Sequence, residues 1–140
     1  MIRFSNHKVL ELLKENSRMP SVKIAAQLGV SEAAVRKAIK KLKSTGVIRR
    51  FTIEVDHKKI GLNIDAIVGI DAKPESYLQI LERLKEYECI ENLFSSTGDH
   101  MIMARCLFED TRKLSEFLKV LEKIDGVIKV CPAIILERIK

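Results

Sequence analysis

The residues whose types and spacing best suit binding chemistry lie in one stretch, residues 21–41, which reads SVKIAAQLGVSEAAVRKAIKK. Two short helices that cross steeply over a tight turn need a small residue where they meet, and Ala25 supplies one. They also need a residue at the turn that tolerates a positive φ, and Gly29 follows there. The spacing therefore predicts a helix-turn-helix, the motif whose second helix enters the major groove of DNA.

The second helix of this motif has an apolar side and a basic side. Successive helical residues are offset by about 100°, which gathers four apolar residues within about 100° of arc: Val35, Ala38, Ile39 and Leu42. Four cations fall on the opposite side: Arg36, Lys37, Lys40 and Lys41. A helix with a solvated basic face is the alternative, and the charge run alone favours it. Together with Ala25 and Gly29 at matching offsets, the pattern favours DNA binding.

We expect the start of this helix to contact base edges and the later cations to contact phosphates. Ala33 lies on the outer side near the helix start, where a small residue lets the helix sit deep in the groove. The candidate base contacts are Ser31, Glu32, Ala33, Arg36 and Lys37. The candidate phosphate contacts are Lys40, Lys41, Lys43, Arg49 and Arg50. Glu32 either accepts from a cytosine amino group or complements the positive end of the helix, which we favour.

The positive charge of the chain is confined to its first half. Residues 1–61 contain 14 Lys and Arg against 5 Asp and Glu, a net charge of +9. Residues 62–140 contain 11 against 14, a net charge of −3, so the whole chain carries +6. This asymmetry predicts one part that faces a polyanion and another with a different task. A protein that coats DNA without reading its sequence is an alternative, although Ala33 and its polar neighbours favour base reading.

Capping residues mark the first two helices. The first is expected to be capped by Ser5 or Asn6, to end near Asn16 and to carry apolar residues at helical spacing: Phe4, Val9, Leu12 and Leu13. Pro20 blocks its continuation. Ser21 is expected to cap the second helix, residues 22–28.

The third helix and the segment after it complete the first half. Ser31 is expected to cap a helix that runs to about Thr45, and Gly46 ends it. Residues 47–55 are rich in β-branched residues and predict a strand or short hairpin, and residues 56–61 predict a hinge. The expected domains are a helix-turn-helix over residues 1–46, a β-strand and hinge linker over 47–61, and a second domain over 62–140.

The second domain alternates strand and helix patterns in the order β-α-β-β-α-β. Strands are expected at residues 64–70, 90–96, 101–108 and 127–136, with helices after Pro74 and after Asp110 or Thr111. This order is typical of the ferredoxin-like fold, in which two helices cover one face of a four-stranded antiparallel sheet. Nothing left in the chain covers the other face, so we expect a partner subunit there. Pro132 indicates a bulge or an edge strand.

The chain is therefore expected to be an α+β protein with an N-terminal (winged) helix-turn-helix and a C-terminal ferredoxin-like domain. No apolar run reaches the length of a membrane span, and the N-terminus lacks a signal-peptide core, so we expect a cytoplasmic protein. Cys89, Cys106 and Cys131 fit neither a metal spacing nor a disulfide framework, which predicts buried, reduced thiols. We expect no metal and no cofactor.

With these residues in view, nearly the whole chain resembles the Lrp/AsnC (feast/famine) family of transcriptional regulators. The likeness rests on the helix-turn-helix, on Gly46-Val47-Ile48-Arg49, on Val55-Asp56 and Ile60-Gly61-Leu62, and on Ser96-Thr97-Gly98-Asp99-His100. The resemblance implies a sequence-specific regulator that binds double-stranded DNA at a pseudo-palindromic operator. It also implies a dimer formed through the C-terminal sheets, which often assembles further into an octamer.

The resemblance further implies a small-molecule effector, usually an amino acid, bound at subunit interfaces near one loop. The residues of this loop are Thr97, Gly98, Asp99, His100 and Met101. The family loop commonly reads Thr-Gly-x-x-Asp, and Met101 occupies the Asp position here. A thioether does not suit an ammonium group as a carboxylate does, so either Asp99 compensates or the effector differs or is absent. A plain β-turn is the alternative interpretation of Thr97-Gly98-Asp99.

An enzyme is the alternative from another class, because some proteins that resemble this family are decarboxylases of haem synthesis. Catalysis needs converging acid, base or metal groups. The three histidines, His7, His57 and His100, fall in the first helix, the hinge and the loop, and share no metal spacing. The strongly basic N-terminal part also argues against catalysis, so we expect a regulator and not an enzyme.

Overall fold

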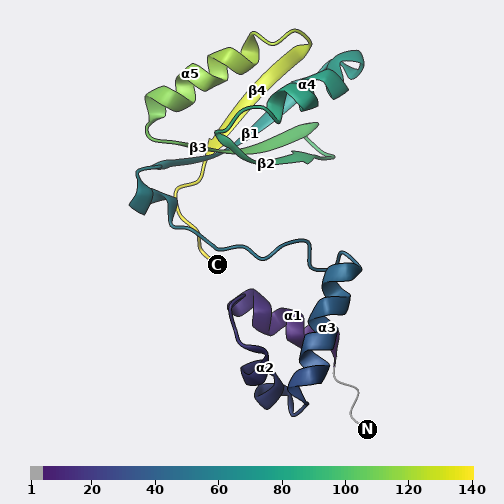
Figure 1. Ribbon diagram of the computed structural model, residues 1–140. Helices are drawn as coiled ribbons and strands as arrows, with labels where there is room; N and C mark the ends of the chain where they lie inside the picture. The colour runs from purple at the N-terminus through teal and green to yellow at the C-terminus, as the bar shows by residue number, and fades with distance from the viewer. Residues whose placement is uncertain (1–4) are drawn as a thin grey trace. The chain divides into compact units, whose positions relative to one another are not determined.

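The computed structural model describes residues 5–140. The contacts within the chain divide it into two compact units, and the boundary along the sequence lies between Val55 and Asp56 (Figure 1). The first unit consists of helices and the second of a sheet with helices.

The helical unit contains α1 (Asn6–Glu15), α2 (Ser21–Leu28) and α3 (Glu32–Ser44). The three helices pack through one apolar stripe each, and together these stripes form a small core whose buried members are Val9, Leu13, Ile24, Ala25, Val35 and Leu42. Ala25 is 5% exposed, as expected for a small residue at a helix crossing. The predicted helix-turn-helix is therefore present.

The ends of these helices follow the predicted capping residues with one exception. The hydroxyl of Ser5 accepts from the amide of His7 at 3.2 Å, and that of Ser31 accepts from the amide of Ala34 at 3.1 Å. Gly29 adopts the left-handed conformation at φ 65° and ends α2. The prediction that Ser21 caps α2 is wrong, because the helix begins at Ser21 itself and the carbonyl of Pro20 accepts its first backbone bonds.

Phe4, assigned by the sequence to the first helix, lies outside the described residues. The strand or hairpin predicted for residues 47–55 is wrong: the segment has no strand in the structure. A strand is held by ladder bonds to a neighbour, and no strand of the described chain pairs with this segment. Apolar side chains of this segment therefore remain exposed, Phe51 by 46% and Ile53 by 75%.

The segment predicted as a hinge forms a turn of 3₁₀ helix, η1 (His57–Ile60), which ends at Gly61 with φ 89°. The side chain of His57 in this turn is only 17% exposed, and its Nε2 atom lies 3.1 Å from Oε1 of Glu91 in the sheet unit.

The sheet unit has the predicted element order. The strands are β1 (Ile64–Ala72), β2 (Ile90–Ser95), β3 (Ile102–Phe108) and β4 (Val127–Ile134). The helices are η2 (Pro74–Ser76), α4 (Tyr77–Leu84) and α5 (Thr111–Glu122). The strands lie in the order β2-β3-β1-β4 and pair antiparallel throughout, which is the ferredoxin-like arrangement. Pro132 lies on β4, an edge strand, as its lack of an amide hydrogen predicts.

Alternation along the central strands places one face of the sheet in the core. Val68 and Ile70 of β1 and Ile102 and Ala104 of β3 are fully buried, and they pack in one cluster with residues of α4 and α5. The helices contribute Ile80, Leu84, Leu114, Phe117 and Leu121 to it. Both helices thus cover the same face of the sheet. Leu78 of α4 lies outside this cluster and is 74% exposed.

The three cysteines are free. Cys106 is fully buried, and burial raises the pKa of its thiol to about 12, so the residue acts as a small apolar core group. Cys89 and Cys131 are only half-buried. Among the described residues, no helix is long and apolar enough to cross a membrane.

Candidate nucleic-acid interface and ligand loop

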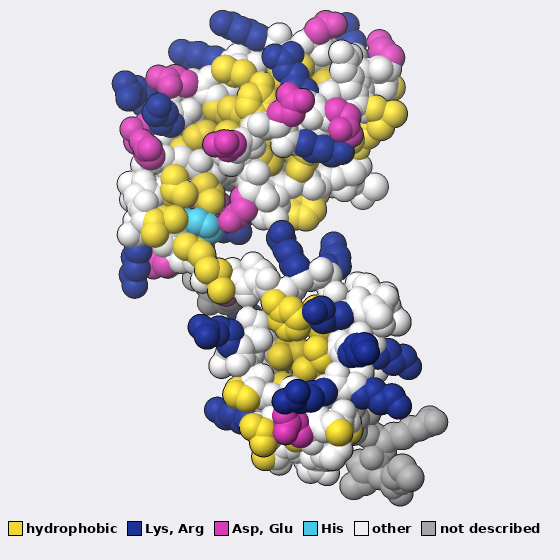
Figure 2. Space-filling model, viewed as in Figure 1, with side chains coloured by type: hydrophobic (Ala, Val, Ile, Leu, Met, Phe, Trp, Pro, Cys, Tyr) yellow, Lys and Arg dark blue, Asp and Glu magenta, His cyan; other side chains and the backbone are white. Residues whose placement is uncertain are grey.

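Helix α3 separates its apolar and basic residues onto opposite sides, as its sequence predicts. Val35 and Leu42 are buried in the core that α3 shares with α1 and α2, and Ala38 is buried as well. All but one of the candidate DNA contacts are exposed: Ser31, Ala33, Arg36, Lys37, Lys40, Lys41, Lys43, Arg49 and Arg50. The exception is Glu32, which is half-buried. In Figure 2, Lys and Arg side chains stand out around the helical unit, whereas the sheet unit carries charges of both signs.

Glu32 is paired with Arg36 one turn further along α3. The Arg36 Nε and Nη2 atoms both donate to Oε1 of Glu32, at 2.8 Å and 2.6 Å. The structure thus gives Glu32 a partner that the sequence interpretation did not include, because residues four apart lie on one side of a helix. The N-terminus of α3 is capped by the hydroxyl of Ser31, so Glu32 is not the capping residue.

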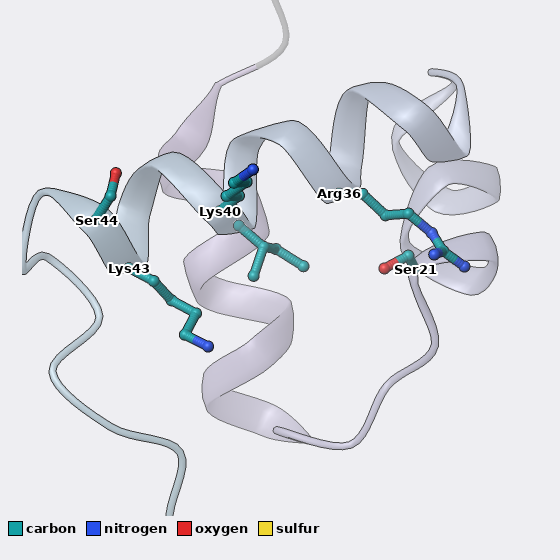
Figure 3. A pocket seen from close by; sticks show the side chains of 6 residues that line it. Ser21, Arg36, Lys40, Lys43 and Ser44 are labelled. Carbon is teal, nitrogen blue, oxygen red and sulfur yellow. The ribbon is translucent and has the colours of Figure 1, made fainter.

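A hollow of about 610 Å³ lies along the basic side of α3 (Figure 3). Three cations and two hydroxyls line it around one apolar residue: Arg36, Lys40, Lys43, Ser21, Ser44 and Ile39. Figure 3 shows Arg36 reaching from α3 toward Ser21 at the start of α2. The sequence interpretation missed Ser21 and Ser44 as lining residues. Ser21 stands at the first position of the helix that precedes the turn, and this position was the available signal.

The segment after α3 is held to the helical unit by two contacts. The Lys43 ammonium lies over the ring of Phe51, 5.7 Å from its centre, which is a cation–π contact. The Ser17 hydroxyl donates to the carbonyl of Thr52 at 3.2 Å. These contacts keep Arg49 and Arg50, which lie between them and the helix, on the same unit as the basic side of α3.

The loop between β2 and β3 is built as a tight connection. Gly98 has φ 101°, and Thr97, Gly98 and Asp99 are exposed. The Ser96 hydroxyl donates to the carbonyl of His100 at 2.7 Å, and the Ser96 amide donates to the carbonyl of Met101 at 2.9 Å. These bonds fix the C-terminal side of the loop against β2.

A carboxylate from β1 completes this loop. Asp71 accepts from the Met101 amide at 3.1 Å and pairs with Nδ1 of His100 at 2.9 Å. The hydrogen bond from His100 lowers the pKa of Asp71, and the Met101 amide and the charge of Lys129 act in the same direction against the effect of burial. The sequence interpretation missed Asp71. The available signal was the position of this acid directly after the strand run predicted for residues 64–70.

Gly69 makes room for the His100 ring on the face of the sheet opposite the helices. A Cβ on Gly69 would lie 2.3 Å from Cδ2 of His100, so a larger residue there displaces the ring. Met101 stands at the position where the resemblance led us to expect an Asp. Its backbone amide donates to a carboxylate, that of Asp71 on the adjacent strand β1.

A second polar network lies toward the other end of β1. Arg105 donates from Nε and Nη2 to Asp65 at 3.0 Å and 2.7 Å, and its Nη1 lies 3.3 Å from Glu91. Glu91 in turn lies 3.1 Å from Nε2 of His57. The bond to Asp65 raises the pKa of Arg105. The network ties η1 to three strands of the sheet unit. Among the described residues, no cluster of His, Cys, Asp and Glu is arranged to hold a metal ion.

Comparison with known proteins assigns both units. Residues 5–49 match a winged helix-turn-helix DNA-binding family, and residues 65–140 match the Lrp/AsnC ligand binding domain. The chain belongs to the Lrp/AsnC family of transcriptional regulators. It is 45% identical over 133 residues to the transcriptional regulator LrpA of Pyrococcus horikoshii, covering 94% of both chains. It is 36% identical over 138 residues to LrpA1 of Halobacterium salinarum, covering 97% of this chain and 96% of the relative.

Solved structures of the Lrp/AsnC fold match the chain along nearly its whole length. The AsnC structure of E. coli superposes with a TM-score of 0.85 at 24% identity, covering 96% of this chain and 92% of that one. A transcriptional regulator of Neisseria meningitidis, solved as a complex with L-Met, superposes with a TM-score of 0.90 at 20% identity, covering 100% and 93%. This chain is thus a DNA-binding transcriptional regulator with a ligand-binding domain, and its family is not one of enzymes.

Proposed function

We propose that this Lrp/AsnC regulator binds a specific operator by placing α3 in the major groove. The observation that carries the proposal is the basic side of α3, where the cations are exposed opposite a fully formed apolar stripe. Near the start of the helix, Ser31, Ala33 and Arg36 are exposed where side chains of such helices meet base edges. Glu32 and Lys37 complete this group of proposed base contacts.

The proposed phosphate contacts surround these residues. They are Lys40, Lys41, Lys43, Arg49 and Arg50, to which we add Ser21 and Ser44 from the hollow beside α3. Hydroxyls and flexible cations suit phosphate oxygens, which position a protein on DNA without reading its sequence. The hollow of about 610 Å³ gives the DNA backbone room beside the helix.

We also propose that two chains pair through the face of the sheet that α4 and α5 leave uncovered. Residues directly opposite in the ladder share a face, so Phe94 and Met103 lie together on this side. Phe94 is 57% exposed, which favours burial against a second copy. Two recognition helices in such a dimer would meet half-sites about one turn of DNA apart, which predicts a pseudo-palindromic operator. Sedimentation at micromolar concentration tests this pairing and separates a dimer from an octamer.

An effector is proposed at the loop of Thr97, Gly98, Asp99, His100 and Met101. The match of residues 65–140 to a ligand binding domain and the L-Met complex of the Neisseria relative favour an amino acid. Asp71 holds the loop through its hydrogen bonds to His100 and to the Met101 amide, and the exposed Asp99 is available to an ammonium group. The effector would act by favouring one assembly of dimers over another. By thermodynamic linkage, if the effector changes the affinity for DNA by some factor, DNA changes the affinity for the effector by the same factor.

The decisive experiment measures binding to DNA from upstream of the gene that encodes this chain. A scrambled duplex of the same length is the competitor, and salt is held at one physiological value. We expect a preference of about a thousandfold or more, with footprints that repeat about every 10 base pairs across two half-sites. Tight binding to both duplexes would instead favour a coating protein, and no binding to either would overturn the proposal.

A further inference from the structure

We propose that Glu32 and Arg36 form a two-residue reader of a G·C base pair, so that Glu32 determines DNA specificity although it adds negative charge to the DNA-binding surface. The proposal rests on the function proposed above, because it requires α3 to lie in the major groove. It concerns the one carboxylate that α3 carries.

The hydrogen bonds within the pair leave the base-reading edge of Arg36 open. A guanidinium has five N–H donors, and Glu32 takes one from Nε and one from Nη2, both through Oε1. The two donors of Nη1 and the second donor of Nη2 are not used by Glu32. These lie at the end of the side chain, in the fork that spans O6 and N7 of a guanine. Glu32 therefore binds the Nε–Nη2 edge of the Arg36 guanidinium and leaves its Nη1–Nη2 edge available to a base.

Glu32 also keeps an acceptor for the partner base. Both bonds from Arg36 go to Oε1, so the second oxygen, Oε2, is not used by this pair. A carboxylate oxygen in the major groove accepts from N4 of a cytosine. One pair of side chains thus matches the donors and acceptors that guanine and cytosine display. The Arg36 side chain is 72% exposed and that of Glu32 41%, so both can be reached by DNA.

The local structure argues against a purely helical role for Glu32. Ser31 already caps α3 through its bond to the amide of Ala34. The Glu32 carboxylate is turned along the helix toward Arg36, away from the free amides at the N-terminus. An exposed ion pair on a helix contributes little to stability, and a carboxylate close to phosphates weakens DNA binding. A role in reading bases accounts for an acid at this position.

The proposal predicts opposite effects on two DNAs when Glu32 is replaced. Loss of its charge should strengthen binding to scrambled DNA, by about twofold to fivefold for one repulsive charge removed. Loss of its hold on Arg36 and of its own acceptor should weaken binding to the operator by about fivefold to a hundredfold. A Glu32 that only stabilises the helix would weaken both, and a Glu32 that is merely a solvated partner of Arg36 would strengthen both.

The test compares Glu32→Gln and Glu32→Ala with a matched control, Glu15→Gln, which removes the same charge from α1. Affinities of the full chain are measured at one salt concentration for the operator, for the scrambled duplex and for operators in which single G·C pairs are changed to A·T. We expect one G·C change to weaken the wild type and the control but to cost the Glu32 variants and Arg36→Lys little. Arg36→Lys keeps the charge and loses the fork.

Parallel shifts on both DNAs, in a wild type that still prefers its operator, would overturn the proposal and leave the proposed function standing. Loss of α-helical circular dichroism in Glu32→Gln, with weaker binding to both DNAs, would assign the residue to helix stability and would also overturn it. A wild type that shows no preference would overturn both, and the scrambled-duplex comparison in the same series identifies that case.

Discussion

The two units of this regulator use charge in different ways. In the sheet unit, Arg105 is paired with both Asp65 and Glu91, Glu91 also contacts His57, and Asp71 is paired with His100. In the helical unit, the cations of α3 have one acidic partner on the helix, and the rest of its basic side is exposed. Charged groups that pair with one another within the fold hold together the elements that carry them. Charges that are left exposed on one side are available to a polyanion.

The largest expected difference between the units concerns their cores. Leu42→Ala and Leu84→Ala each remove a buried side chain, at an expected cost of about 2–5 kcal/mol in unfolding free energy. The core around Leu42 is small, so its loss should unfold the helical unit and abolish DNA binding. Leu84→Ala should destabilise the sheet unit instead. Circular dichroism melts and DNA titrations of both variants test this, and identical effects would show that the units do not fold separately.

The second prediction concerns the two kinds of arginine. Arg105→Ala leaves the half-buried Asp65 without its two donors, and we expect a loss of about 1–2 kcal/mol in the sheet unit after allowing for solvent. Arg49→Ala, in the exposed segment, should leave stability within about 0.5 kcal/mol. Urea unfolding measures both. If Arg49→Ala proved as costly as Arg105→Ala, the contrast between satisfied and exposed charges would be wrong.

A third prediction uses a cation far from the start of α3. Lys41→Ala should weaken binding to operator and scrambled DNA alike and lower the slope of log affinity against log salt by about one. The melting temperature should hardly change, because the side chain is exposed. Titrations at four or five salt concentrations provide the slope. An unchanged slope would remove Lys41 from the interface, and Lys8→Ala in α1 serves as a control for a cation outside α3.

The smallest expected effect is a dependence of the sheet unit on acid. The folded-state pKa of Asp71 is lowered, chiefly by the hydrogen bond from His100. Its ionised form therefore stabilises the fold above the unfolded pKa of about 3.9, and this contribution is lost as the pH falls through the lower folded pKa. Asp71→Asn should be less stable than wild type at pH 6, and the gap should close toward pH 2. A gap that is constant over that range would mean that the charge of Asp71 contributes nothing.

The sequence predicted most of the fold because its local signals agree with the tertiary structure. Gly29 and Ser31 mark the turn and cap of the recognition helix, and the β-type run of residues 64–70 coincides with the strand β1. The prediction for residues 47–55 is wrong, since a β-type pattern does not supply the neighbouring strand that a ladder needs. The assignment of α3 residues to bases and phosphates stays a prediction.

The sequence by itself determined the helix-turn-helix, the β-α-β-β-α-β order and the confinement of positive charge to the first half, because helical spacing, strand alternation and charge are local properties. Only the tertiary structure decided which polar groups meet. Asp71 reaches the loop of His100 and Met101 from a strand about 30 positions earlier in the chain, and His57 reaches Glu91 from outside the sheet. Such pairs depend on strand order and register, which bring distant residues together through packing that no single segment encodes.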